Sequence, residues 1–206
     1  MSKMTDMRKI AALILLGMVA LGCQAPEAEI APQLVRTSSE GNVSPEKAKN
    51  WQNVLAEQLP LLGHRNWVVV ADSAYPWQTS AGIETIYTNQ DQLSVLREVM
   101  SQLKRQKHVQ PIIMLDKELD SVPEDLAPGV STYRKDLAGV LGDVVPQKML
   151  HEQIIAKLDE TGKTFHVLLL KTNLTIPYTS VFLQLDCGYW GAAKEAKLRS
   201  LMGQAH

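Results

Sequence analysis

The sequence predicts an α/β fold, with helices layered on a sheet. Segments with the apolar pattern of strands alternate along the chain with segments of helical spacing, and such alternation is typical of this class. The clearest strand is residues 67–71 (WVVVA), a continuous apolar run of the kind found in strands covered on both faces. The clearest helix is residues 91–107, where apolar residues recur at helical spacing from Leu93 to Leu103.

The first element of the predicted domain is a helix. Ser44, Pro45 and Glu46 place a capping residue, a proline and an acid where a helix would begin. Apolar residues then recur at helical spacing through residues 51–59, and Pro60 ends the element.

The other predicted elements follow in alternation. Four more strands are expected, at residues 83–88, 111–115, 165–170 and 181–185. Two more helices are expected, at residues 148–160 and 192–202. Residues 121–146 contain three prolines and three glycines, and we expect one short helix there, near residues 133–141.

The first residues of the chain have a composition of their own. Residues 7–9 include two positive charges, residues 10–21 are apolar or small throughout, and Cys23 follows after one glycine. A charged start, an apolar stretch and a small residue before the cleavage point form the layout of a secretory signal. The apolar stretch is too short for a spanning helix, which needs roughly 20 residues.

Residues 20–23 (ALGC) resemble the lipobox of bacterial lipoproteins. The resemblance implies cleavage before Cys23, lipidation of its thiol, and a lipid anchor at the periplasmic face of a bacterial membrane. Gln24 resembles the residue found at this position in lipoproteins that are sorted to the outer membrane. The alternative is an ordinary secretory signal followed by an incidental cysteine.

Three regions follow from these patterns. Residues 1–22 are expected to be a lipoprotein signal peptide, residues 23–43 a flexible tether rich in proline, serine and scattered acids, and residues 44–206 one folded domain.

The 21 basic and 22 acidic residues nearly balance and do not cluster, which argues against a nucleic-acid partner. Two cysteines far apart in sequence cannot build a thiolate metal site.

Polar side chains at the ends of the predicted strands are the candidate site residues, because ligands of α/β proteins bind where loops leave the sheet. His64 precedes the first strand and Asp72 follows it. His151 lies in the first turn of a predicted helix, and Tyr178 and Ser180 precede the last strand. The sequence contains no phosphate loop, dinucleotide fingerprint, nucleophile elbow or His-Glu-x-x-His zinc motif, so no metal is expected.

Three short motifs resemble those of one family in the same order. Residues 62–76 contain Leu-Gly-His, an apolar strand, an aspartate and Tyr-Pro; residues 151–153 are His-Glu-Gln; and residues 177–180 are Pro-Tyr-Thr-Ser. Together they resemble the D-ribose pyranase/L-fucose mutarotase (RbsD/FucU) family over roughly residues 51–189. The resemblance implies a single three-layer domain with a central mixed sheet, which assembles into a homo-oligomeric ring whose sites are completed by neighbouring subunits.

The same resemblance implies a reaction and roles for residues. The reaction is the interconversion of anomers or ring forms of a free aldose, a monosaccharide, by acid/base catalysis without a metal or cofactor. His64 would be the general acid, Asp72 and His151 would bind sugar hydroxyls, and Tyr178 would lie near the ring oxygen. Ser180 stands where the family has asparagine. These residue types suit the chemistry, because histidine exchanges protons near neutral pH and a carboxylate accepts two hydroxyls.

Each of these residues also has a purely structural interpretation. His64 would fix the start of a strand, Asp72 would form a turn, His151 would be an exposed helix residue, and Tyr178 would pack in a loop. The alternative function is that of a non-catalytic lipoprotein that retains the fold and binds a sugar or another protein. Ser180 and the expected export favour this alternative, whereas His64 and Asp72 favour the enzyme.

Overall fold

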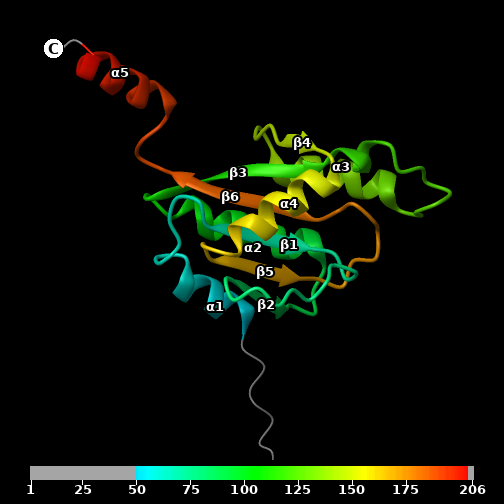
Figure 1. The fold of residues 1–206 in the computed structure, drawn as a ribbon. Coiled ribbons are helices and arrows are strands. Elements are labelled where there is room, and N and C mark those ends of the chain that lie inside the picture. The colour runs from blue at the N-terminus through cyan, green and yellow to red at the C-terminus, as the bar shows by residue number, and fades with distance from the viewer. Residues whose placement is uncertain (1–49, 204–206) are drawn as a thin grey trace, which may run out of the picture. The chain divides into compact units, whose positions relative to one another are not determined.

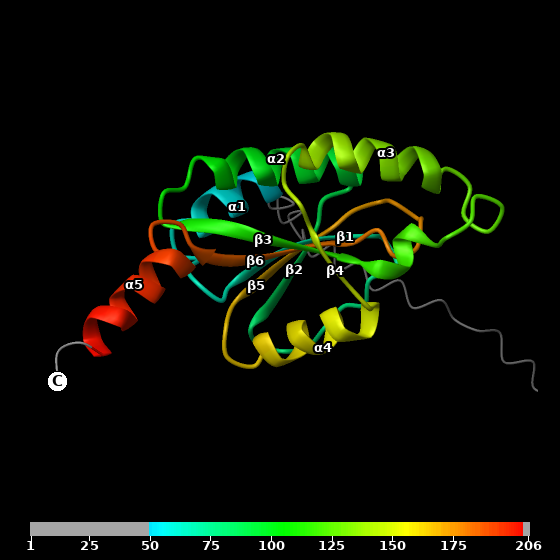
Figure 2. The same cartoon turned by 90° about the horizontal axis from the view of Figure 1, so that it is seen from above.

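The computed structural model of the protein describes residues 50–203, which form a mixed sheet with helices on both faces (Figures 1 and 2). The expected signal peptide, lipidation site and tether lie outside these residues. The strands, in chain order, are β1 Trp67–Ala71, β2 Ile83–Tyr87, β3 Val109–Asp116, β4 Gln147–Met149, β5 Val167–Lys171 and β6 Val181–Cys187. The helices are α1 Trp51–Gln58, α2 Gln92–Lys104, α3 Val130–Leu141, α4 His151–Thr161 and α5 Ala192–Gly203, with a short 3₁₀ helix, η1, at Lys117–Asp120.

The sheet has the strand order β2-β5-β1-β6-β3-β4. Strands β2, β5 and β1 run parallel to one another, and so do β3 and β4. Strand β6 lies between the two groups and runs antiparallel to both β1 and β3. The predicted α/β class with a central mixed sheet is therefore confirmed.

Two hydrophobic clusters cover the two faces of the sheet. Val68 and Val70 of β1 pack with α1, α2 and α3 on one face. Trp67 and Val69 point the other way and pack with Ile154 of α4. Figure 2 shows the same arrangement, with α1, α2 and α3 on one side of the sheet and α4 on the other. Every residue of β1 is buried, because side chains alternate between two covered faces.

Most elements lie close to their predicted bounds, but two helix starts were wrong. Helix α1 begins at Trp51, and its cap is Asn50, whose side chain accepts a hydrogen bond from the backbone N–H of Gln52; the expected cap Ser44 lies outside the described residues. The helix expected from Lys148 begins at His151 instead. Its first predicted residues belong to β4, whose backbone pairs with β3 from Met114 onward.

Two further observations concern the described part of the chain. None of the helices between residues 50 and 203 is long and apolar enough to cross a membrane. Helix α5 contributes no buried residue, and its Leu201 and Met202 are both more than half exposed.

Candidate functional site

Polar residues at the ends of three central strands lie together at one end of the sheet. Asp72 follows β1, Asp116 is the last residue of β3, and Ser180 precedes β6. Because β6 is antiparallel to both neighbours, its first residue, Val181, pairs with Val70 near the end of β1 and with Leu115 near the end of β3. The topology therefore brings together side chains that lie far apart in sequence.

Asp72 is half-buried and held by its neighbours. Its Oδ2 accepts a hydrogen bond from Ser180 Oγ at 2.8 Å, and its Oδ1 accepts one from the backbone N–H of Ala74 at 2.9 Å. The Asp72 backbone N–H in turn donates to Ser180 Oγ at 3.2 Å. Ser180 is only 1% exposed, so its hydroxyl serves to hold Asp72. Each carboxylate oxygen of Asp72 keeps a lone pair for another donor.

His151 is the first residue of α4, and two acidic residues hold it. Its Nδ1 lies 3.0 Å from Asp116 Oδ2. Its backbone N–H donates to both carboxylate oxygens of Glu118 in η1, at 3.1 Å each. Leu150, the residue before the helix, offers no side-chain cap, so Glu118 caps the helix instead. The negative charge of Glu118 at the helix N-terminus also interacts favourably with the helix dipole.

Tyr178 lies against His151. The two ring centroids are 5.6 Å apart with an interplanar angle of 81°, an edge-to-face arrangement. Tyr178 has a backbone φ of +59°, which is uncommon for a residue other than glycine. Strained backbone of this kind is concentrated at binding and catalytic sites. Tyr178 remains 39% exposed, and an open hollow of about 350 Å³ lies beside it, lined by Lys117, Glu118, Ser121, Val122, Leu150 and Tyr178.

The electrostatics of this end are set by burial. The Asp116 side chain is fully buried, and burial raises the pKa of its carboxyl; the hydrogen bond from His151 acts against this rise, and the nearby carboxylates of Glu118 and Asp72 add to it. Burial also raises the pKa of Tyr75, with smaller contributions from Asp159, Asp116 and Asp72. Asp116 Oδ1 and the Tyr75 hydroxyl are buried without a hydrogen-bond partner in the described chain.

His64 lies at the other end of the sheet. Its Nε2 is 3.5 Å from Asp186 Oδ1, and its side chain is 62% exposed. Asp186 stands six positions beyond Ser180 on β6, a separation of roughly 20 Å along a strand. Arg65, which follows His64 in the chain, has a φ of +79°, and its guanidinium lies 4.2 Å from the centroid of the Phe165 ring. Within one chain, therefore, Asp72, His151, Tyr178 and Ser180 lie at the same end of the sheet, and His64 lies at the opposite end.

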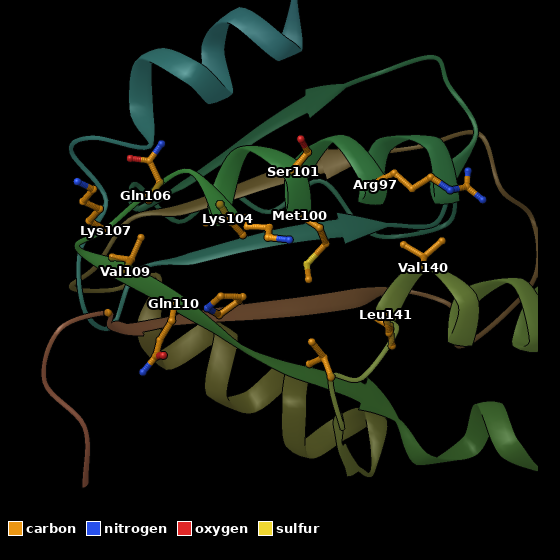
Figure 3. Close-up of a pocket in the computed structure, with 14 residues that line it drawn as sticks. Arg97, Met100, Ser101, Lys104, Gln106, Lys107, Val109, Gln110, Val140 and Leu141 are labelled. Carbon is orange, nitrogen blue, oxygen red and sulfur yellow. The ribbon is translucent and has the colours of Figure 1, made fainter. Parts of the chain in front are cut away.

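A hollow larger than the one beside Tyr178 lies elsewhere on the described chain. It measures about 900 Å³ and lies between α2, the N-terminal half of β3 and the end of α3 (Figure 3). Its apolar lining includes Met100, Val109 and Leu141, and its polar lining includes Arg97 and Lys104. Its lining contains no histidine or carboxylate, and histidine is the side chain that most often transfers protons in enzymes.

Three residues of the site were missed in the sequence. Asp116 ends an apolar strand just as Asp72 does, and this position was the available signal; the predicted strand stopped one residue short of it. Tyr75 belongs to the Tyr-Pro motif but was not named as a candidate, and Glu118 showed no comparable signal, because its importance depends on where α4 docks. Within residues 50–203, no three His, Cys, Asp or Glu side chains are grouped so that they could hold a metal ion.

Comparison with known proteins finds no protein-family model and no curated protein that matches the chain. RbsD of Bacillus subtilis complexed with D-ribose aligns at 19% identity and a TM-score of 0.45, covering 65% of this chain and 91% of that chain. The fucose mutarotase of Streptococcus pneumoniae in complex with L-fucose aligns at 19% identity and a TM-score of 0.45, covering 69% and 97%. FucU from Bifidobacterium longum aligns at 15% identity and a TM-score of 0.44, covering 65% and 92%. All three scores lie below 0.5, so these likenesses do not establish this chain's activity.

Proposed function

We propose that the protein interconverts the anomers or ring forms of a free aldose by acid/base catalysis without a cofactor. The observation that carries the proposal is the group of side chains at one end of the sheet. Asp72 is a carboxylate that its neighbours hold in place and that keeps lone pairs for other donors, His151 is a partly exposed imidazole, and the ring of Tyr178 lies edge-to-face against it. Carboxylate, imidazole and phenol together can bind several sugar hydroxyls and exchange protons with them.

The chemistry requires two proton transfers. Opening a pyranose ring needs a proton delivered to the ring oxygen while another group takes the proton of the anomeric hydroxyl. The described site supplies binding groups and one histidine, and His64 is the proposed acid. Because His64 lies at the opposite end of its own sheet, we propose that it reaches the site of a neighbouring copy in a homo-oligomeric ring.

The experiment that tests the function is exchange NMR on a panel of free aldoses, which shows anomer and ring-form exchange without a coupled assay. Acceleration by the wild type supports the proposal, and no acceleration for any common aldose contradicts it. If the protein then still binds a sugar with an affinity that depends on Asp72, the alternative function, a non-catalytic binding protein, takes its place.

Substitutions at Asp72 and Tyr178 are expected to weaken sugar binding to different extents. Asp72→Asn should cost about 1.5–3 kcal/mol, because a hydrogen bond to a charged group is lost. Tyr178→Phe should cost about 0.5–1.5 kcal/mol, the typical contribution of one neutral hydrogen bond. Titration of the sugar by NMR or calorimetry measures both. Tyr189→Phe is the matched control, because Tyr189 is an exposed tyrosine that follows the C-terminal end of β6, and it should leave the affinity unchanged.

The lipid anchor is a separate proposal that depends on residues 20–23. We expect metabolic palmitate labelling of the expressed protein and loss of the label in Cys23→Ser, because the thiol of Cys23 would carry the lipid. Cys187→Ser is the control and should keep the label. An unlabelled wild-type protein found free in the periplasm would contradict the anchor while leaving the proposed reaction open to its own test.

A further inference from the structure

The His151 imidazole is fixed on one side and open on the other. Asp116 Oδ2 lies 3.0 Å from Nδ1, Glu118 holds the backbone N–H, and the Tyr178 ring lies edge-to-face against the imidazole. The other ring nitrogen, Nε2, forms no hydrogen bond with any residue between 50 and 203, and the His151 side chain is 40% exposed. The imidazole is therefore oriented by protein groups with one nitrogen left for a ligand.

We propose that Asp116 and His151 form a dyad in which His151 Nε2 is the base for the anomeric hydroxyl and Asp116 is its positioning residue. This inference rests on the proposed function and adds to it, since Asp116 matches none of the motifs in the sequence and His151 was expected only to bind hydroxyls. It assigns the second of the two proton transfers that ring opening requires, with His64 left as the acid.

The tautomer follows from the chemistry of the pair. An imidazole is a stronger base than a carboxylate, so the shared proton lies on Nδ1 and Asp116 accepts it. With Nδ1 protonated, Nε2 of the neutral ring carries a lone pair and accepts. The carboxylate then stabilises the positive charge that His151 gains when Nε2 takes a proton, as an acidic residue does in other carboxylate–histidine pairs.

The step balances without a further reactant. His151 Nε2 removes the proton of the C1 hydroxyl, the O–H electron pair forms the C1=O bond, and the bond between C1 and the ring oxygen breaks. The ring oxygen keeps that electron pair and takes a proton from the acid. Reclosure on the other face of the aldehyde gives the other anomer and returns both protons.

Asp116 is difficult to explain by stability alone. Its side chain is fully buried, and Oδ1 has no hydrogen-bond partner in the described chain. A buried carboxylate with an unsatisfied oxygen costs stability, and well-packed apolar residues are often as good or better at such positions. The remaining oxygen is aimed at the one imidazole of the site, which is the arrangement that a positioning role requires.

The test is ¹⁵N NMR of the histidine side chains in the full-length protein, purified in detergent, with His151→Gln to assign the signal. The wild type should show the Nδ1–H tautomer at His151. Asp116→Asn should change the tautomer ratio and slow aldose exchange about 100-fold, near the lower bound for a positioned acid or base. The control is Asp120→Asn, an exposed aspartate that pairs with Lys148; it should change neither.

Each outcome decides a different point. An Nε2–H tautomer in the wild type overturns the dyad even if the Asp116 variant fails to fold. A changed tautomer with an unchanged exchange rate in Asp116→Asn overturns the catalytic role of the pair. A wild type with the Nδ1–H tautomer but no acceleration of any aldose overturns the proposed function and the role of His151 as a base.

Discussion

Replacement of His64 by alanine is expected to slow the exchange between sugar ring forms by roughly 10²–10⁴-fold, the usual contribution of a positioned acid or base. The fold should survive the change. The side chain is 62% exposed, and its ion pair with Asp186, at 3.5 Å, is a surface contact that contributes at most about 1 kcal/mol. Exchange NMR measures the rate, and thermal unfolding measures the stability.

Asp186→Asn is the matched control for this prediction. It removes the ion pair but keeps the imidazole, so its exchange rate should stay close to that of the wild type. A His64→Ala protein that melts at a much lower temperature and loses activity in proportion would point to a structural histidine. A variant with the full wild-type rate would remove His64 from the mechanism altogether.

The elements that could be predicted are those whose pattern is local. The apolar run at β1 and the apolar stripe of α2 lie in the sequence itself, and both elements have the predicted type. Strand β4 could not be predicted, because Gln147–Met149 has no strand pattern and is extended only through its pairing with β3. The start of α4 depends in the same way on Glu118, which caps it from another element.

The site shows the same division. Asp72 could be found because it directly follows a strong strand, and Tyr178 because it precedes another. Asp116 also lies at the end of a strand, but it was not predicted as a site residue, because its contact with His151 depends on α4 docking across the end of β3. His64 and Asp72 are close in sequence, yet the strand between them carries them to opposite ends of the sheet. The distance between His64 and Asp72 becomes clear only in the three-dimensional structure.

That separation leads to the second large effect, the recovery of activity when two impaired variants form mixed oligomers. If each site takes Asp72 from one copy and His64 from a neighbour, His64→Ala and Asp72→Asn subunits should complement each other. In a randomly mixed ring, about one quarter of the sites would draw both intact residues. Coexpression of the two variants with different tags, isolation of mixed oligomers through both tags, and exchange NMR below sugar saturation measure the recovery.

A double variant, His64→Ala with Asp72→Asn, is the control. When it is coexpressed with His64→Ala, no site can contain an intact His64, so no recovery is expected. A protein that remains monomeric by native mass spectrometry at micromolar concentration would contradict the ring and the shared site. Mixed oligomers that form but stay inactive would show that His64 does not act across the interface. The acid would then have to come from the end of the sheet that holds Asp72 and His151, where the Tyr178 ring lies edge-to-face against the His151 imidazole.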